Sequence, residues 1–271
     1  MTMNGMNKIT VKDILNRKQK EHRKIAVLTA YDFPFANLVD QAGIDIVLVG
    51  DSVGMVCLGY ESTVPVSMRE MLHHTKAVSR AVKHALIVAD MPFGSYQTAA
   101  SAVRNARRFL KEAGAEAVKL EGGKRIIEQV KALVRAGIPV MGHLGMTPQT
   151  ATELGGYKVQ GKTKKDAQKI LNEAKELERA GVFSIVLECV PRGLAARVTE
   201  ALWVPTIGIG AGPAADGQVL VLHDLLGFES AVRPRFVRRY ADLNKVISEA
   251  LFKYRSDVLK KKFPSLTESF E

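Results

Sequence analysis

Short apolar runs rich in Val, Ile and Leu recur along the chain, separated by longer segments in which apolar residues return every three to four positions. Continuous apolar runs of this length are typical of parallel strands that are covered on their outer face. The longer segments have the periodicity of amphipathic helices. We count eight apolar runs and predict strands at 25–30, 46–50, 85–89, 117–120, 139–142, 184–187, 205–209 and 219–222.

The segments between these runs carry helix-forming residues and end in a recognisable way. Ala-Gly pairs stand directly before the next strand at Gly43, Gly114, Gly137 and Gly181, and glycine is the usual residue just past the last turn of a helix. The pattern predicts crossover helices at 68–83, 99–113, 125–136 and 164–180, and a last helix at 235–254 that leads into a charged tail from about residue 255.

Alternating strands and helices fit either an open doubly wound sheet or a closed barrel. Eight units favour the barrel, and a chain of 271 residues is close to the usual length of about 250 for one such domain. No long linker rich in Pro, Gly or Ser divides the chain. We therefore predict an α/β protein with a single-domain (β/α)8 TIM barrel over residues 1–271.

Composition excludes several classes of protein. Hydrophobic residues make up 46% and charged residues 25%, which is ordinary for a soluble globular chain. No apolar stretch reaches the roughly 18 to 20 residues of a membrane span, and residues 1–10 lack the apolar core of a signal peptide. Two cysteines are too few for a disulfide framework. We expect a cytoplasmic protein without membrane association.

The net charge of +11 is compatible with a nucleic-acid surface or with attraction of small anionic substrates. The basic residues are dispersed along helical segments, and no nucleic-acid-binding motif accompanies them. A solvated basic surface is the favoured interpretation, and no nucleic-acid partner is expected.

Polar residues follow the predicted strands, and in a (β/α)8 barrel the active site lies where the strands end. We expect these strand ends to converge on one site. The residues concerned are Tyr31, Asp32, Asp51, Ser52, Asp90, Lys119, Glu121, His143, Glu188, His223 and Asp224, together with the glycine-rich run 208–212.

Asp51 and Asp90 follow neighbouring strands, so their carboxylates are placed to share a hard divalent cation. Mg²⁺ is the expected metal, because the cysteine and histidine spacings of a zinc site are missing. Glu121, after the next strand, would bind the ion directly or through water. The competing interpretation is that each carboxylate only caps the following helix.

Lys119 and Glu121 are two positions apart in a strand and should point to the same side. Lys119 would bind a substrate carboxylate or, with a depressed pKa, form a Schiff base; a purely structural ion pair is the alternative. Glu188, partly buried, suits a general base or acid. His143 could donate to an oxyanion or be structural. The run 208–212 would bind phosphate or form a tight turn.

Several motifs, taken together, closely resemble the ketopantoate hydroxymethyltransferase family over nearly the whole chain. They are LTAYD at 28–32, VGDS at 49–52, ADMPF at 89–93, VKLEGG at 118–123, GHLGMTPQ at 142–149, GGYKVQG at 155–161, LECVP at 187–191 and IGIGAG at 207–212.

The resemblance implies a Mg²⁺-dependent transfer of a hydroxymethyl group from 5,10-methylenetetrahydrofolate to 3-methyl-2-oxobutanoate. The products would be 2-dehydropantoate and tetrahydrofolate, at the first step of pantothenate and coenzyme A biosynthesis. It also implies a homo-oligomer, typically a decamer. The implied roles are a catalytic base for Glu188, metal binding for Asp51, Asp90 and Glu121, and substrate binding for Asp51, Ser52, Asp90, Lys119 and His143.

Two other functions remain as alternatives at this point. Another Mg²⁺ barrel that acts on 2-oxo acids through an enolate, such as a phosphoenolpyruvate mutase or an isocitrate-lyase-like enzyme, would share the metal site but not the folate cosubstrate. A basic nucleic-acid-binding protein built on a barrel would show salt-sensitive DNA binding and no affinity for Mg²⁺.

Overall fold

The structure, a computed structural model, describes residues 7–151, 153, 156, 158–228 and 234–271. Part of the motif at 155–161 therefore lies outside the described residues. The chain forms two compact units, Met1–Val221 and Leu222–Glu271.

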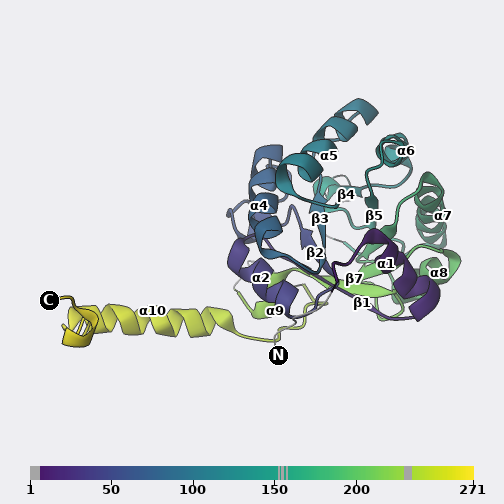
Figure 1. The fold of residues 1–271 in the computed structure, drawn as a ribbon. Coiled ribbons are helices and arrows are strands. Elements are labelled where there is room, and N and C mark those ends of the chain that lie inside the picture. Colours follow the sequence, from purple (N-terminus) through teal and green to yellow (C-terminus); the bar gives the residue numbers. More distant parts are fainter. Residues whose placement is uncertain (1–6, 152, 154–155, 157, 229–233) are drawn as a thin grey trace. The chain divides into compact units, whose positions relative to one another are not determined.

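The first unit is a closed barrel of parallel strands in the order of the chain, with β1 paired to β8 (Figure 1). The predicted (β/α)8 barrel is therefore confirmed, and the open doubly wound sheet is excluded. Within the described residues the strands are β1 Ile25–Thr29, β2 Ile46–Val49, β3 Leu86–Asp90, β4 Ala117–Glu121, β5 Val140–Gly145, β6 Ser184–Glu188, β7 Thr206–Ile209 and β8 Gly217–Leu220.

Helices connect the strands and cover the outside of the barrel (Figure 1). The glycines predicted to end helices, Gly43, Gly114, Gly137 and Gly181, all have positive φ, as left-handed C-caps require. The elements are α1 Val11–Asn16, η1 Arg17–Glu21, α2 Phe33–Gln41, α3 Val53–Val56, α4 Met68–Ala81, α5 Ala99–Ala113, η2 Lys124–Ile126, α6 Ile127–Arg135, η3 Pro148–Thr150, α7 Lys164–Ala180 and α8 Arg192–Ala201.

Apolar side chains between strands and helices form the core of the barrel. Every residue of β2, β3 and β4 is buried, and the helices contribute fully buried residues such as Phe109, Leu133 and Leu177. Burying a side chain of this size contributes about 1.5–3 kcal/mol relative to leaving it exposed. This burial explains why the strands read as continuous apolar runs rather than alternating ones.

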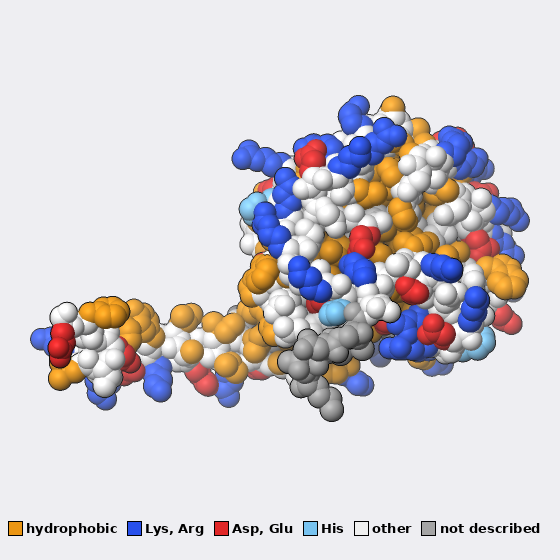
Figure 2. Space-filling view, in the orientation of Figure 1, with side chains coloured by type: hydrophobic (Ala, Val, Ile, Leu, Met, Phe, Trp, Pro, Cys, Tyr) orange, Lys and Arg blue, Asp and Glu red, His pale blue; other side chains and the backbone are white. Residues whose placement is uncertain are grey.

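The N-terminal segment contacts the barrel at the amino ends of the strands. Arg17 forms a 2.9 Å ion pair with Asp45, which directly precedes β2, and Lys18 forms a 3.0 Å ion pair with Asp216, which precedes β8. The carboxyl ends of the strands, at the opposite end of the barrel, are thus left for other contacts. Lys and Arg side chains are spread over the face shown in Figure 2, with acidic side chains between them.

The second unit contains α9 Leu222–Leu226, α10 Leu243–Leu259 and η4 Leu266–Glu268. The prediction that the last helix spans 235–254 was wrong in both bounds. The helix begins after Asp242, whose carboxylate accepts from the Lys245 N–H and caps the first turn, and it continues to Leu259. Among the helices that the structure describes, none combines the length and apolar character needed to cross a membrane.

Candidate active site

Charged side chains from neighbouring strands meet at the carboxyl ends of β2 to β6. The strand register pairs Asp90 with Lys119 and Glu121 with His143. The side chains of each pair are therefore neighbours on adjacent strands. We call the group Asp51, Asp90, Lys119, Glu121, His143 and Glu188 the strand-end cluster. All of its members except Glu188 are between 3% and 6% exposed, and Glu188 is half-buried. The predicted convergence of these strand ends is confirmed.

Lys119 lies among the carboxylates of the cluster. Its Nζ is 3.3 Å from Asp90 Oδ1, 3.8 Å from Glu121 Oε1 and 3.1 Å from His143 Nδ1. Burial lowers the pKa of Lys119, but the neighbouring carboxylates outweigh burial and raise it above its ordinary value. Lys119 is therefore an ammonium ion, as anion binding requires. A Schiff-base lysine needs the opposite shift, so this direction disfavours that role.

His143 lies between two carboxylates. Its Nδ1 is 3.4 Å from Glu121 Oε1, and its Nε2 is 3.3 Å from Glu188 Oε2. Burial and the Lys119 ammonium lower the pKa of His143, whereas the two carboxylates raise it, with a net result of about 9. A neutral ring would accept from the Lys119 ammonium at Nδ1, whereas the carboxylates beside both ring nitrogens favour the charged ring, which forms an ion pair with each of them.

Two carboxylates of the cluster are each held by one backbone N–H group. Asp90 Oδ2 accepts from the Asp51 backbone N–H at 3.0 Å, and Glu121 Oε2 accepts from the Gln149 backbone N–H at 3.0 Å. Among the described residues, Asp90 Oδ1 and Glu121 Oε1 are buried without a hydrogen-bond partner. Both oxygens face Lys119 Nζ in an ion pair, at 3.3 and 3.8 Å, but neither accepts a hydrogen bond. Buried polar atoms rarely lack a hydrogen bond, so these two oxygens indicate a place for a cation, water or ligand.

The charge of the cluster points the same way. Among the residues that the structure describes, the carboxylates of this cluster form ion pairs with Lys119 and His143 alone. With four carboxylates and two cations, the fully ionised cluster carries two excess negative charges. In the metal-free protein, burial and then the neighbouring carboxylates Asp90 and Glu121 raise the pKa of Asp51 well above its ordinary value. A divalent cation would neutralise the excess, so the donor set fits Mg²⁺.

Within the part of the chain that the structure describes, no three His, Cys, Asp or Glu side chains enclose a metal position. This does not argue against Mg²⁺, which commonly takes only one or two carboxylates and completes its shell with water and substrate oxygens. Asp51 and Asp90 meet that requirement. The helix-capping interpretation is wrong for both, because the N-cap of α3 is Ser52 and that of α5 is Thr98.

Ser52 lies at the edge of the cluster, directly after Asp51. The Tyr31 hydroxyl is 2.8 Å from Ser52 Oγ, and burial raises the pKa of Tyr31, so its phenol stays protonated. Ser52 itself is half-buried and thus open to a ligand. Asp32, also predicted at a strand end, instead caps α2 by accepting from the Phe35 N–H at 2.9 Å.

The glycine run after β7 packs against protein atoms. A Cβ at Gly208 would lie 3.1 Å from the Gln218 side chain, and a Cβ at Gly212 would lie 2.7 Å from Arg192 Cβ. Gly210 and Gly212 also have positive φ. These observations favour the tight-turn interpretation of the run over the phosphate-binding one. His223 and Asp224 belong to the second unit.

The sequence interpretation assigned no role to Gln149 or Tyr96, which contact the cluster. Gln149 Nε2 donates to Asp51 Oδ2 at 2.7 Å, and the Tyr96 hydroxyl donates to Gln149 Oε1. Neither residue follows a strand, since Gln149 lies in η3 and Tyr96 in the loop before α5. Gln149 is the last residue of the motif at 142–149, but the motif alone does not show which residues its side chain contacts.

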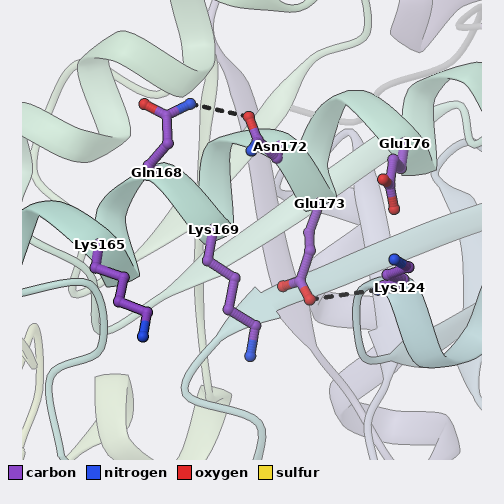
Figure 3. Close-up of a pocket in the computed structure, with 7 residues that line it drawn as sticks. All are labelled: Lys124, Lys165, Gln168, Lys169, Asn172, Glu173 and Glu176. Carbon is purple, nitrogen blue, oxygen red and sulfur yellow. Dashed lines mark hydrogen bonds between the residues drawn. The ribbon is translucent and has the colours of Figure 1, made fainter.

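A groove of about 510 Å³ lies beside α7 and contains no member of the cluster (Figure 3). The Lys124 backbone N–H donates to Glu173 there at 3.4 Å, and the lysines around the groove are exposed. Its lining residues are Lys124, Lys165, Gln168, Lys169, Asn172, Glu173 and Glu176. The groove lacks the buried polar groups of the strand-end cluster, so the cluster is the better candidate for catalysis.

A closed barrel with buried, mutually interacting acids and bases at its strand ends defines the protein as a (β/α)8-barrel enzyme. The family model for ketopantoate hydroxymethyltransferase matches residues 8–266. The chain therefore belongs to the ketopantoate hydroxymethyltransferase family and is a hydroxymethyltransferase.

Curated relatives support the same assignment. The 3-methyl-2-oxobutanoate hydroxymethyltransferase of Carboxydothermus hydrogenoformans is 57% identical over 266 residues, covering 98% of this chain and 96% of the relative. The enzyme of the same name from Moorella thermoacetica is 56% identical, covering 98% of both chains.

Solved structures with a similar fold are more distant in sequence. Phosphonopyruvate hydrolase in complex with oxalate and Mg²⁺ superposes with a TM-score of 0.65 at 15% identity, covering 96% of this chain and 93% of that one. Oxaloacetate acetylhydrolase gives a TM-score of 0.57 at 14% identity, covering 79% and 80%. At these identities the likeness shows the barrel fold alone.

Proposed function

We propose that the enzyme transfers a hydroxymethyl group from 5,10-methylenetetrahydrofolate to 3-methyl-2-oxobutanoate with the help of Mg²⁺. The products are 2-dehydropantoate and tetrahydrofolate, and the reaction begins pantothenate biosynthesis. The names of the relatives support the 2-oxo acid. The observation that carries the metal is the pair of buried oxygens, Asp90 Oδ1 and Glu121 Oε1, that have no hydrogen-bond partner among the described residues.

Asp51 and Asp90 hold the cation in this proposal, with Glu121 as a third metal-site residue that binds directly or through water. When bound, Mg²⁺ acts as a Lewis acid on the keto oxygen of the substrate and thereby acidifies the hydrogen on carbon 3. Lys119 stays charged and binds the substrate carboxylate, while Ser52 and His143 contribute hydrogen bonds to the same substrate.

Glu188 removes the proton from carbon 3 of the 2-oxo acid. It is suited to this role because it is the cluster member that is not fully buried and because His143 Nε2 orients its carboxylate from 3.3 Å. The resulting carbanion equivalent attacks the one-carbon unit of the folate. The new carbon–carbon bond forms, and both carbon–nitrogen bonds of the methylene bridge break. Water supplies the hydroxyl group of the product, while its remaining proton and the proton taken by Glu188 go to the two folate nitrogens as tetrahydrofolate leaves.

The enzyme acts as a cytoplasmic homo-oligomer, a decamer by family resemblance, without nucleic-acid or membrane partners in this proposal. The second unit supports self-association, because none of the residues of α10, a helix described in full, is buried within that unit. Leu251 and Phe252 are 63% and 73% exposed, and Figure 2 shows apolar side chains along this helix. Exposed apolar faces of this kind commonly mark contacts with another chain.

The test is an assay of the purified protein with 3-methyl-2-oxobutanoate, labelled methylenetetrahydrofolate and either MgCl₂ or EDTA. We expect label in 2-dehydropantoate only when both substrates and Mg²⁺ are present. Transfer that persists in EDTA would remove the metal from the proposal. A protein that yields no folate-dependent product but cleaves or rearranges another 2-oxo acid would instead favour the lyase and mutase alternative.

A further inference from the structure

Gln149 joins two carboxylates that come from different strands of the barrel. Its side-chain Nε2 donates to Asp51 Oδ2 at 2.7 Å and to the Met91 carbonyl at 2.9 Å. Its backbone N–H donates to Glu121 Oε2 at 3.0 Å. Gln149 is only 4% exposed, so these bonds form away from bulk water, where they are strong and costly to lose.

Tyr96 determines which way the Gln149 amide faces. The Tyr96 hydroxyl donates to Gln149 Oε1, which leaves both Nε2 hydrogens for Asp51 and Met91. A flipped amide would point its oxygen at the Asp51 carboxylate and at a carbonyl, both of which are acceptors. Burial raises the pKa of Tyr96, so the hydroxyl remains a donor. The orientation of the amide is therefore fixed by the network.

We propose that Gln149 is a positioning residue for the metal site, and that Tyr96 fixes its amide for this task. By occupying Asp51 Oδ2, Gln149 directs the remaining oxygen of Asp51 to the cation. It also ties Asp51, after β2, to Glu121 at the end of β4, across the intervening strand β3. The inference rests on the proposed Mg²⁺ site and adds a residue to which that function assigned no role. Hydrogen bonds to the residues that bind a metal typically contribute about 10- to 100-fold in metal affinity or activity.

The test compares Gln149→Met with the wild type by isothermal titration with MgCl₂ and with MnCl₂. Methionine has a similar length but donates no hydrogen bond, and the backbone N–H to Glu121 is unaffected. We expect the dissociation constant for the metal to rise about 10- to 100-fold. In kinetics, kcat should fall and the KM for the 2-oxo acid should rise, while the KM for the folate stays near the wild-type value.

Tyr96→Phe removes one hydroxyl from the network and should weaken metal binding several-fold, in the same direction. It also decides the matter if Gln149→Met does not fold, because it preserves nearly all of the side-chain volume. Gln168→Met is the matched control, since Gln168 is an exposed residue of α7 whose amide bonds only Asn172 among the contacts observed. Its metal affinity should equal that of the wild type.

The outcomes separate the two proposals. If the wild type binds metal and folded Gln149→Met and Tyr96→Phe bind it equally well, the positioning role is wrong and the proposed function stands. If the wild type binds neither Mg²⁺ nor Mn²⁺, the proposed function is wrong. The positioning role is then wrong as well, because it depends on the metal site. A loss of thermal stability without a change in metal affinity would also overturn the positioning role.

Discussion

Glu188 Oε2 lies 3.3 Å from His143 Nε2, at the carboxyl ends of adjacent strands β6 and β5. The same imidazole reaches Glu121 Oε1 through its other nitrogen, at 3.4 Å. His143 therefore links the candidate base to the candidate metal site. Against the effect of burial, the two carboxylates raise the pKa of His143 to about 9, which favours the charged ring and an ion pair with each of them.

Replacing Glu188 by Gln should slow proton removal without disturbing binding. The amide is isosteric but cannot accept a proton, so we expect exchange of the carbon-3 hydrogen of 3-methyl-2-oxobutanoate with deuterium oxide to slow by about 10²- to 10⁴-fold. Proton NMR follows the exchange, and calorimetry should show Mg²⁺ and 2-oxo acid bound as in the wild type. Glu112→Gln, on an exposed surface of α5, is the control. Wild-type exchange in Glu188→Gln would refute the assigned role.

Lys119→Met should destabilise the metal-free protein. Removing the ammonium leaves the buried carboxylates of Asp90 and Glu121 without their main counter-charge, and breaking a buried pair in this way costs about 3–5 kcal/mol. Urea unfolding in EDTA measures the loss in the free energy of unfolding. Lys131→Met is the control, because Lys131 pairs with Glu128 on the exposed surface of α6 and should change stability by less than about 1 kcal/mol. Equal losses in the two variants would contradict the electrostatic role of Lys119.

The barrel and the strand-end cluster were predictable from the sequence because both follow from local pattern. Each strand is hidden from water and reads as an apolar run, and parallel closure brings every strand end to one face. Lys119 and Glu121 illustrate this, since their two-residue spacing in a strand predicts that both side chains point to the same side of the sheet. In the structure, Lys119 Nζ lies 3.8 Å from Glu121 Oε1.

Gln149 and Tyr96 were not predictable in the same way. Gln149 lies 98 positions after Asp51, and its contact with Asp51 depends on the path of the loop after β5. No repeating pattern in the sequence predicts that path. The start of α10 was misjudged for a related reason, because the helical pattern extends upstream of residue 243 while the cap that sets the boundary is a single side chain, Asp242. Contacts made by loops and caps depend on tertiary path rather than on repeating pattern.

Gly145→Ala should disturb both the fold and the site. Gly145 ends β5 with φ +97°, and a Cβ there would lie 2.1 Å from the Glu188 carbonyl oxygen, so the strand carrying the candidate base must shift. We expect a loss of about 2–4 kcal/mol from backbone strain and overpacking, together with reduced kcat. Gly137→Ala is matched for positive φ but meets no atom within 4 Å, and it should cost only about 1–2 kcal/mol. Similar unfolding curves for the two variants would show that the contact with Glu188 is unimportant.

Mg²⁺ should stabilise the protein more as the pH rises. Burial, followed by the neighbouring carboxylates, raises the pKa of Asp51 in the metal-free fold, so Asp51 holds its proton more tightly when folded than when unfolded. Its contribution to stability is therefore present below the ordinary Asp pKa and is lost as the pH rises through the higher folded pKa. Mg²⁺ binds the deprotonated carboxylate, so its affinity increases over the same window and offsets that loss.

Thermal unfolding in MgCl₂ and in EDTA, across a series of pH values, should give a Tm difference that widens with pH. Asp51→Asn, which cannot titrate, should flatten the series, and a Tm difference in the wild type that is constant with pH would contradict the assignment of Asp51 to the metal.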